Sequence, residues 1–293
     1  MKQAVVEAHA KINLTLDVTG KRPNGYHDVC MVMQSIGIHD LVTVRTGTGT
    51  GQIKLAISNS ILPSDPSNLA WRAAELFLEE QQLACDGIAI EIEKHNPIAA
   101  GLAGGSTDAA AVLVLLNQLY DTRLSVEQLM EMGVKLGADV PFCIAGGTML
   151  AQGIGEQLTS LPDTPQSYVV LCKPPFAVST PAIYKAIDSA EISTRPDTQA
   201  MLEALRRNDL KAVAEQLCNV MQPVTAQMHP EVEEICGMMR DNGALGAIMS
   251  GSGPSVFGLF DDQAAAEACK AVLEEQYEET FLTNFSPAGQ IKR

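Results

Sequence analysis

A glycine-rich stretch between an alternating strand and an apolar helix constrains this chain more than any other feature. Residues 97–111 read Pro-Ile-Ala-Ala-Gly-Leu-Ala-Gly-Gly-Ser-Thr-Asp-Ala-Ala-Ala, and isoleucines alternate with alanine and glutamate over 88–93. The alternation predicts a strand, and the apolar run after the glycines predicts a buried helix. Glycines let backbone N–H groups turn toward one point, and a helix start adds unpaired donors and a positive dipole end. This order of strand, loop and helix predicts a cradle for an anion such as a nucleotide phosphate.

The order of residues in the loop excludes two common nucleotide-binding motifs. It is not a Walker A loop, because no Gly-Lys-Ser or Gly-Lys-Thr closes it. It is not a Rossmann fingerprint, because Ala103 stands where the second glycine would be. On these residues alone, a glycine-rich helix start that serves only packing remains the alternative to a phosphate site.

The composition favours a packed protein with reduced thiols. The chain has 293 residues, enough for one large or two medium domains, and 46% of them are hydrophobic. The longest purely apolar run, Ala109–Leu116, is too short to cross a bilayer, and the N-terminus carries no signal-peptide pattern. Seven scattered cysteines without a Cys-x-x-Cys pair favour a cytoplasmic protein over a disulfide framework or a cysteine zinc site. We therefore expect a cytoplasmic protein that does not associate with membranes.

The formal net charge of −15 argues against a nucleic-acid-binding surface. An anionic substrate would therefore have to be bound by locally concentrated cations. Taken one at a time, each basic residue is more simply a solvated surface charge. Several nevertheless cluster around glycine-bearing turns, namely Lys11, Lys21, Arg22, His27, Lys94 and His95.

The first half of the chain predicts several strands and then helices. Apolar and polar residues alternate over 4–18, and Asn-Gly within Lys21–His27 predicts a turn. A helix should follow Ser67-Asn68, and another should begin after Ser125, where Gln128 completes a capping box, and end at Gly137. Further strands are predicted near 29–36, 41–46, 52–58 and 148–151, with glycines 47, 49 and 51 in a hairpin connection.

The second half mixes strands and helices without strict alternation. Two prolines within 160–166 indicate a boundary, and a strand over 168–172 is followed by several helices between about 180 and 242. A Gly-Ser-Gly loop at 250–254 lies between predicted strands at 244–249 and 255–260, and a last helix spans about 262–276. This arrangement favours an α+β fold over a doubly wound sheet.

Three separated segments together resemble the GHMP kinase superfamily, whose members phosphorylate small alcohols with ATP. They are Ala8–Leu14 (Ala-His-Ala-Lys-Ile-Asn-Leu), Gly20–His27 (Gly-Lys-Arg-Pro-Asn-Gly-Tyr-His) and Gly137–Phe142 (Gly-Ala-Asp-Val-Pro-Phe). The resemblance covers nearly the whole chain and is strongest to members that phosphorylate the 2-hydroxyl of a cytidine diphosphate sugar alcohol in the non-mevalonate isoprenoid pathway. It implies a two-domain α+β architecture, with mixed sheets, packed helices and the nucleotide site between domains 1–158 and 159–293.

The resemblance also implies an ATP site with Mg²⁺. Ser106 is the candidate Mg²⁺ contact, and Asn68 and Lys94 would lie around the adenine. Without the family, Asn68 reads as a helix cap and Lys94 as a surface lysine. Ala103 departs from the glycine that many relatives carry, and we expect it to adopt ordinary dihedral angles. The implied ATP-binding residues are Asn68, Lys94, Pro97, Ala100, Gly101, Leu102, Ala103, Gly104, Gly105, Ser106 and Thr107.

Lys11 and Asp139 are the implied catalytic residues. Asp139 would accept the proton of the substrate hydroxyl or orient that hydroxyl, and Lys11 would stabilise charge on the transferring phosphoryl group. The alternatives are an N-cap for Asp139, because Pro141 suits a first helical turn, and a strand-face lysine for Lys11. The implied substrate-binding residues are Asn13, Tyr26, His27, Tyr184, Gly251, Ser252 and Gly253.

Two other functions stay open on the sequence. Another GHMP small-molecule kinase, of the homoserine or mevalonate type, would share the glycine loop and the Gly-Ser-Gly segment. A non-catalytic nucleotide-binding sensor would keep the cradle but would need neither Lys11 nor Asp139. The sequence leaves the oligomeric state open between a monomer and a homodimer.

Overall fold

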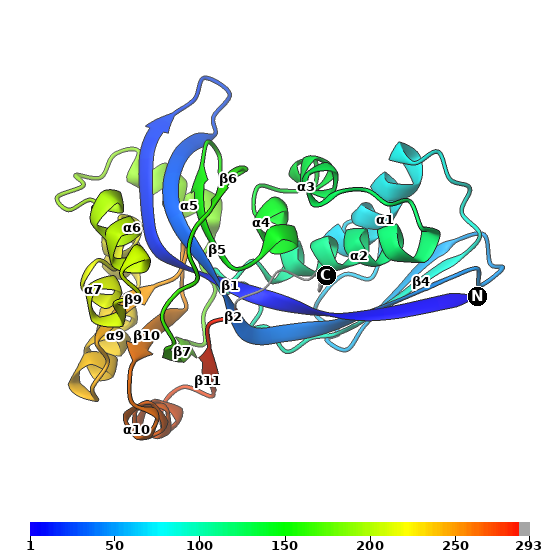
Figure 1. The fold of residues 1–293 in the computed structure, drawn as a ribbon. Helices are drawn as coiled ribbons and strands as arrows, with labels where there is room; N and C mark the ends of the chain where they lie inside the picture. Colours follow the sequence, from blue (N-terminus) through cyan, green and yellow to red (C-terminus); the bar gives the residue numbers. More distant parts are fainter. Residues whose placement is uncertain (287–293) are drawn as a thin grey trace.

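Two long antiparallel strands run through the whole molecule and organise the fold. In the computed structural model, which describes residues 1–286, β1 (Lys2–Lys21) and β2 (His27–Thr46) are each 20 residues long. The predicted turn joins them, with Gly25 at a φ of 88°. Figure 1 shows both strands crossing the molecule and then bending beside α6. The separate strands expected near 29–36 and 41–46 are therefore one strand, because β1 stays paired with β2 through a shift in register between His9 and Lys11.

The first sheet has seven strands in the order β3-β4-β2-β1-β8, with β5 paired to β2 and β6 to β5. The glycine segment 47–51 does not form the expected hairpin. Instead β3 pairs in parallel with β4, which lies between β3 and β2. The bounds of these strands are β3 Ile53–Ile57, β4 Ile88–Glu93, β5 Thr148–Gln152, β6 Gln157–Ser160 and β8 Cys218–Asn219.

Four helices pack on one face of this sheet (Figure 1). The central one, α2, is buried almost all round, which explains why its sequence is apolar on every side. The predicted caps are confirmed: the Asn68 side chain accepts from the amide of Ala70, and Ser125 and Gln128 form the capping box. The bounds are α1 Leu69–Glu80, α2 Gly104–Tyr120, α3 Val126–Val134 and α4 Val140–Ala145.

The second sheet has four strands in the order β11-β7-β10-β9, all antiparallel to their neighbours. Sequence patterning predicts β7, β9, β10 and the helices, but it does not predict β11, whose residues lack a clear alternation. The strands are β7 Tyr168–Lys173, β9 Gly246–Met249, β10 Val256–Phe260 and β11 Glu279–Asn284. The helices are α5 Thr180–Ile187, α6 Thr198–Arg206, α7 Leu210–Glu215, α8 Gln222–Met228, α9 Glu231–Asp241 and α10 Gln263–Glu274.

The two halves are joined by more than the chain connection. The short strand β8 pairs in parallel with β1, and Ile36 of β2 bridges to Phe285 just after β11. One mixed sheet, one antiparallel sheet and the helices packed on them confirm the α+β class. Within residues 1–286, no helix is both long enough and apolar enough to span a membrane. All seven cysteines are free thiols.

Candidate active site

The glycine loop links the end of β4 to the start of α2 and contains three left-handed residues. Ala99, Gly101 and Ala103 have φ values of 52°, 74° and 61°. The expectation that Ala103 takes ordinary dihedral angles is therefore wrong. Ala103 is the N-cap of α2, and the chain enters the helix through its left-handed conformation, with a φ of 61° and a ψ of 26°. An alanine in this conformation costs about 1 kcal/mol relative to a glycine.

The start of α2 presents free amides. Among the described residues, the N–H groups of Gly104 and Gly105 have no hydrogen-bond acceptor, whereas those of Ser106 and Thr107 both donate to the Ala103 carbonyl. The Thr107 side chain is buried, and its hydroxyl donates to the Gly104 carbonyl at 2.8 Å. Ser106 is therefore the hydroxyl that faces the open space in front of the helix. Free amides at a helix start are a binding site for anions.

The Gly-Ser-Gly loop of the second half packs directly on the glycine loop. The Ser250 hydroxyl donates to the Gly101 carbonyl at 3.2 Å. A Cβ atom on Gly101 would lie 2.4 Å from the Ser250 carbonyl oxygen, so only glycine fits. The buried Asn219 side chain donates to the carbonyls of Met249 and Gly251, both at 2.8 Å, and so holds the Gly-Ser-Gly loop in place.

A cavity of about 540 Å³ lies where these loops meet. Its wall includes the predicted residues Lys11, Asn13, Asn68, Lys94, Pro97, Ala100, Gly101, Leu102, Ala103, Gly104, Gly105, Ser106, Asp139, Tyr184, Gly251 and Ser252. Thr107, Tyr26, His27 and Gly253 are not among the residues that line it. The fold therefore brings the glycine loop, the lysine–aspartate pair and the Gly-Ser-Gly loop around one space, which is large enough for a small ligand.

Lys11 is held in the cavity wall. Its side chain is buried, and its ammonium group donates to Oδ1 of the Asn13 side chain at 2.8 Å. Asn13 is fully buried and donates in turn to the sulfur of Met31 at 3.2 Å. Across residues 1–286, no carboxylate lies within 4 Å of this ammonium group. Lys11 is therefore a buried, fixed cation whose charge is available to a ligand, rather than a surface lysine.

Asp139 stands at the N-cap position of α4, but its side chain makes no capping hydrogen bond. Its charge acts on two neighbours, Cys143 of α4 and the cavity residue Tyr184. Burial and then the Asp139 charge raise the pKa of the Cys143 thiol well above its usual value, although Lys11 opposes this. Burial and then Asp139 also raise the pKa of Tyr184 to about 12. The Asp139 carboxylate is thus left free of the helix backbone and lies within electrostatic range of both Cys143 and Tyr184.

Lys94 is neither exposed nor free. Its ammonium group forms ion pairs with Asp40 and with Asp108 of α2, the latter at 2.8 Å. Burial opposes its charge, but the two carboxylates outweigh burial and raise the pKa of Lys94. Asp40 also accepts from the amides of His95 and Asn96, so one fully buried carboxylate anchors the whole β4–loop junction.

Asp108 is the site residue that the sequence reasoning missed. It is buried, it lines the cavity, and its Oδ1 atom has no hydrogen-bond partner among the described residues. Burial raises the pKa of Asp108 to about 7, with Lys94 opposing the shift and Asp40 adding to it. The signal in the sequence is a charged residue in the first turns of an otherwise apolar buried helix. Such a residue must be paired or functional.

Two of the predicted substrate residues, Tyr26 and His27, lie outside the cavity lining, and His27 contacts the lining residue Tyr184. The rings of His27 and Tyr184 stack at 4.8 Å with 20° between their planes. His27 and Lys21 both contact Asp188, at the end of α5, with 2.7 Å from the His27 Nε2 atom. Tyr26 is 59% exposed next to this stack. The turn between β1 and β2 is thereby fixed against α5, whose Tyr184 side chain reaches the cavity. The cavity is also lined by residues that no sequence motif singles out, namely Leu16, Met31, Leu62, Ile154, Thr180 and Met221.

Comparison with known proteins identifies the family. The family described as GHMP kinases N terminal domain matches residues 68–147, and GHMP kinases C terminal matches residues 201–279. The 4-diphosphocytidyl-2-C-methyl-D-erythritol kinase of Lachnoclostridium phytofermentans is 46% identical over 290 residues, which cover 98% of each chain. This chain belongs to the 4-diphosphocytidyl-2-C-methyl-D-erythritol kinase family. The Clostridium botulinum kinase of the same name is 43% identical over 278 residues, which cover 95% of this chain and 98% of the relative.

Solved structures agree with this assignment. A crystal structure of a 4-(cytidine 5'-diphospho)-2C-methyl-D-erythritol kinase superposes with a TM-score of 0.81 at 32% identity, covering 97% of this chain and 99% of the other. A homoserine kinase from Cytophaga hutchinsonii superposes with a TM-score of 0.79 at 20% identity, covering 99% and 96%, and shows the common fold alone. As a member of the 4-diphosphocytidyl-2-C-methyl-D-erythritol kinase family, the protein is an ATP-dependent small-molecule kinase of GHMP type.

Proposed function

We propose that the protein transfers the γ-phosphoryl group of ATP to the 2-hydroxyl of 4-diphosphocytidyl-2-C-methyl-D-erythritol, in the non-mevalonate isoprenoid precursor pathway. The observation that carries the proposal is one cavity lined by three features. They are free amides at the start of α2, the buried Lys11, and Asp139, whose side chain makes no capping hydrogen bond. Membership of a kinase family named for this substrate supports the choice of alcohol.

In this proposal the glycine loop binds the ATP phosphates. The amides of Gly104 and Gly105 and the hydroxyl of Ser106 face the cavity and would donate to phosphate oxygens. The adenine would lie toward Asn68 and Lys94. Because the Asn68 side chain caps α1 and the Lys94 ammonium is held by two carboxylates, both would act on the nucleotide mainly by shaping the wall.

Mg²⁺ fits the residues present beside the cradle. Asp108 offers a buried oxygen without a partner, and Ser106 offers a hydroxyl two residues earlier on the same helix start. Hard oxygen atoms of this kind are the ligands that Mg²⁺ prefers. We propose that these two side chains hold the ion, directly or through water. When bound, it would neutralise charge on the ATP phosphates.

Asp139 and Lys11 would carry out the transfer. Phosphoryl transfer depends mostly on positioning and charge neutralisation, so the protein has little covalent chemistry to perform. Asp139 would accept the hydrogen bond of the attacking hydroxyl and aim it at the γ-phosphorus. Lys11, fixed by Asn13, would stabilise the charge that develops on the transferring oxygens.

The cytidine end of the substrate would bind beside the β1–β2 turn. Tyr184 lines the cavity and also stacks on the His27 ring. A pyrimidine in the cavity would therefore stack next to this pair of aromatic rings. Tyr26 would cover the outer face and His27 would contact the polar edge of the base. Asn13 would contact the sugar alcohol or its diphosphate, and Gly251, Ser252 and Gly253 would face the methylerythritol end.

We further propose that the protein works in the cytoplasm as a monomer or homodimer, without nucleic-acid or membrane partners. The seven free thiols and the acidic net charge support this proposal. The order of the strands supports a division into domains near residue 158, because β6 belongs to the first sheet and the next strand, β7, belongs to the second. The boundary as drawn falls inside β6.

An ADP-release assay with a panel of alcohols tests the function. We expect Mg·ATP turnover with 4-diphosphocytidyl-2-C-methyl-D-erythritol and none with homoserine or mevalonate. Turnover with homoserine or mevalonate alone would favour another GHMP kinase. Nucleotide binding without turnover of any alcohol would favour the sensor.

A further inference from the structure

Outside the cavity, three side chains with metal-binding atoms meet on β1 and β2. Glu7 and His9 are two residues apart on β1, and His39 stands directly opposite His9 in the antiparallel register. Residues two apart on a strand share a face, and directly opposed side chains are neighbours. One ligand atom from each of the three side chains lies within 4.8 Å of the other two.

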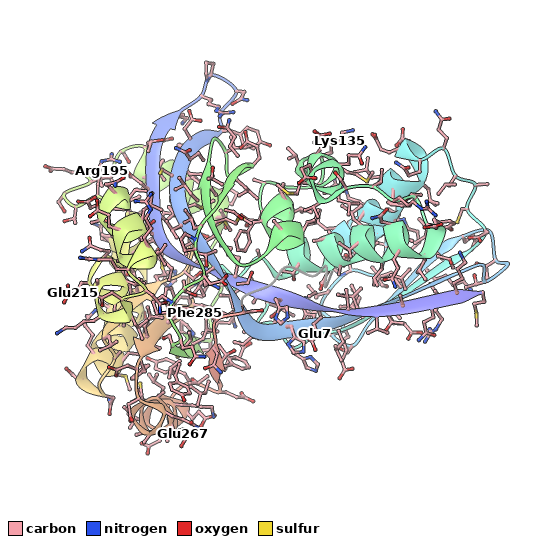
Figure 2. The ribbon with its side chains drawn as sticks, viewed as in Figure 1. Glu7, Lys135, Arg195, Glu215, Glu267 and Phe285 are labelled. Atoms are coloured by element: carbon pink, nitrogen blue, oxygen red, sulfur yellow. The ribbon has the colours of Figure 1, made fainter. Side chains whose placement is uncertain are left out.

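The cluster lies on the face of the sheet opposite the helices. Its strand neighbours Ala8 and Asp40 are fully buried, and Asp40 pairs with Lys94 beneath α2. Alternation therefore directs Glu7, His9 and His39 the other way. Figure 2 shows Glu7 on the side of β1 away from α2 and α3. Glu7 is exposed and both histidines are half-buried, so an ion could reach them from solvent.

Backbone carbonyls orient both imidazole rings. The Nδ1 atom of His9 lies 3.1 Å from the Ile36 carbonyl oxygen, and that of His39 lies 2.7 Å from the Gly37 carbonyl oxygen. Because a carbonyl only accepts, each Nδ1 carries a hydrogen, and in the neutral form of such a ring Nε2 keeps its lone pair. A metal-ligating histidine is held in this same way, with the second nitrogen donating to a carbonyl.

The ligand atoms of Glu7 and His9 are spaced as two ligands of one metal ion are. Oε2 of Glu7 is 3.3 Å from Nε2 of His9, and in the neutral ring both atoms are acceptors. Two ligands bound to Zn²⁺ at about 2.0–2.2 Å with tetrahedral angles lie roughly 3.3–3.6 Å apart, which matches this spacing.

We propose that Glu7, His9 and His39 form a binding site for one divalent transition-metal ion, with Zn²⁺ as its occupant. Two imidazoles and one carboxylate leave the fourth tetrahedral position to water. Mg²⁺ prefers oxygen ligands, so this site is chemically distinct from the one proposed beside the ATP phosphates. The ion would clamp β1 to β2 next to the register shift that precedes Lys11.

Metal titration of the untagged, chelator-treated full-length protein tests the site. We expect one Zn²⁺ per chain by calorimetry. Co²⁺ should show the visible absorption of tetrahedral nitrogen and oxygen ligation, without a thiolate charge-transfer band. The melting temperature should rise on adding Zn²⁺. A thiolate band would assign the ion to cysteines and overturn the proposal, as would the absence of stoichiometric binding.

Substitutions localise the ion. His9→Gln and His39→Gln should each weaken Zn²⁺ binding by at least roughly 10–100-fold, because that is the loss caused by removing only an outer-shell partner of a ligand. Glu7→Gln should weaken it too. His229→Gln, which removes a histidine stacked on Phe176, is the matched control and should bind as the unchanged protein does. Binding that is unaltered in the His9→Gln/His39→Gln double variant, with its circular dichroism unchanged, would refute the assignment.

Discussion

The hydroxyl of Ser250 donates a hydrogen bond to the carbonyl of Gly101, and this contact joins the two loops that form the cavity. Gly101 belongs to the segment between β4 and α2, whereas Ser250 follows β9 in the second sheet. The glycine loop and the Gly-Ser-Gly loop are therefore positioned by each other as well as by their own sheets. A substitution at this contact should therefore disturb both the glycine loop and the Gly-Ser-Gly loop.

Gly101→Ala should damage the site. Its Cβ would lie 2.4 Å from the Ser250 carbonyl oxygen, and the residue has a φ of 74°. Forcing the loops apart should cost about 1–3 kcal/mol in stability and lower kcat/KM by at least roughly tenfold. Gly237→Ala is the control, because a Cβ there meets no atom within 4 Å. Equal melting temperatures and activities for both variants would mean that the loop contact does not matter.

Much of the fold can be predicted from local patterns, because the deciding interactions are local. The Asn68 and Ser125 caps, the buried α2 and the β1–β2 turn depend on residues close in the chain. The failures involve distant partners. Glycines 47–51 look like a hairpin, but β4 takes the place beside β2. β11 is specified by its pairing with β7 rather than by its own alternation.

The same distinction holds for the candidate site. Lys11, Asp139 and the glycine loop are recognisable because they lie in short motifs, and the fold does bring them to one cavity. The partners of Lys94 could not be predicted, because Asp40 lies 54 residues away from it in the sequence. The left-handed conformation of Ala103 could not be predicted either, because an alanine gives no sign of it.

Ala103→Gly should stabilise the protein. The left-handed conformation costs an alanine about 1–2 kcal/mol, which glycine avoids. Glycine also has more conformational freedom in the unfolded state, and this reduces the gain in stability by about 0.4–1 kcal/mol. The free energy of unfolding should therefore rise by about 0.5–1 kcal/mol in a urea titration. Ala271→Gly, at an exposed position inside α10, should instead lower it by about 1 kcal/mol. A loss of stability at both positions would contradict the strain at Ala103.

Asp139→Asn should remove most activity while leaving ATP binding intact. The amide keeps the shape of the side chain but cannot accept the proton or hold the hydroxyl as a carboxylate does. We expect kcat to fall by roughly 10²–10⁴-fold. The affinity for an ATP analogue, measured by calorimetry, should stay the same, since the glycine loop is untouched. An Asp139→Asn enzyme with normal kcat would end the assignment.

The Asp188 carboxylate should make stability depend on pH in the acid range. Hydrogen bonds from His27 and then Lys21 lower the pKa of Asp188 below its usual value of 3.8. The unfolded chain therefore binds this proton first as the pH falls. The stabilisation is complete above the unfolded pKa and is lost as the pH drops through the folded one.

The measurement compares melting temperatures of the wild type and Asp188→Asn from pH 7 to pH 3. The wild type should melt higher at pH 5–7, and its advantage should shrink below about pH 4. Asp163→Asn, which removes an exposed carboxylate with no ion pair among the described residues, should show no such trend. If the wild type still melts higher than Asp188→Asn by the same margin at pH 3, the contacts of Asp188 with His27 and Lys21 are not the source of the difference.

Tyr26→Ala should weaken binding of the cytidine substrate specifically. Tyr26 is 59% exposed and directly precedes His27 of the His27–Tyr184 stack, so removal of its ring should leave the fold intact. Loss of one stacking contact with a base costs about 1–3 kcal/mol, which corresponds to a KM for the alcohol roughly 5–150-fold higher. The KM for ATP should not change, and Tyr26→Phe should behave like the wild type because the ring, not the hydroxyl, makes the contact. Parallel increases in both KM values would show that Tyr26 supports the cavity in general and does not read the base.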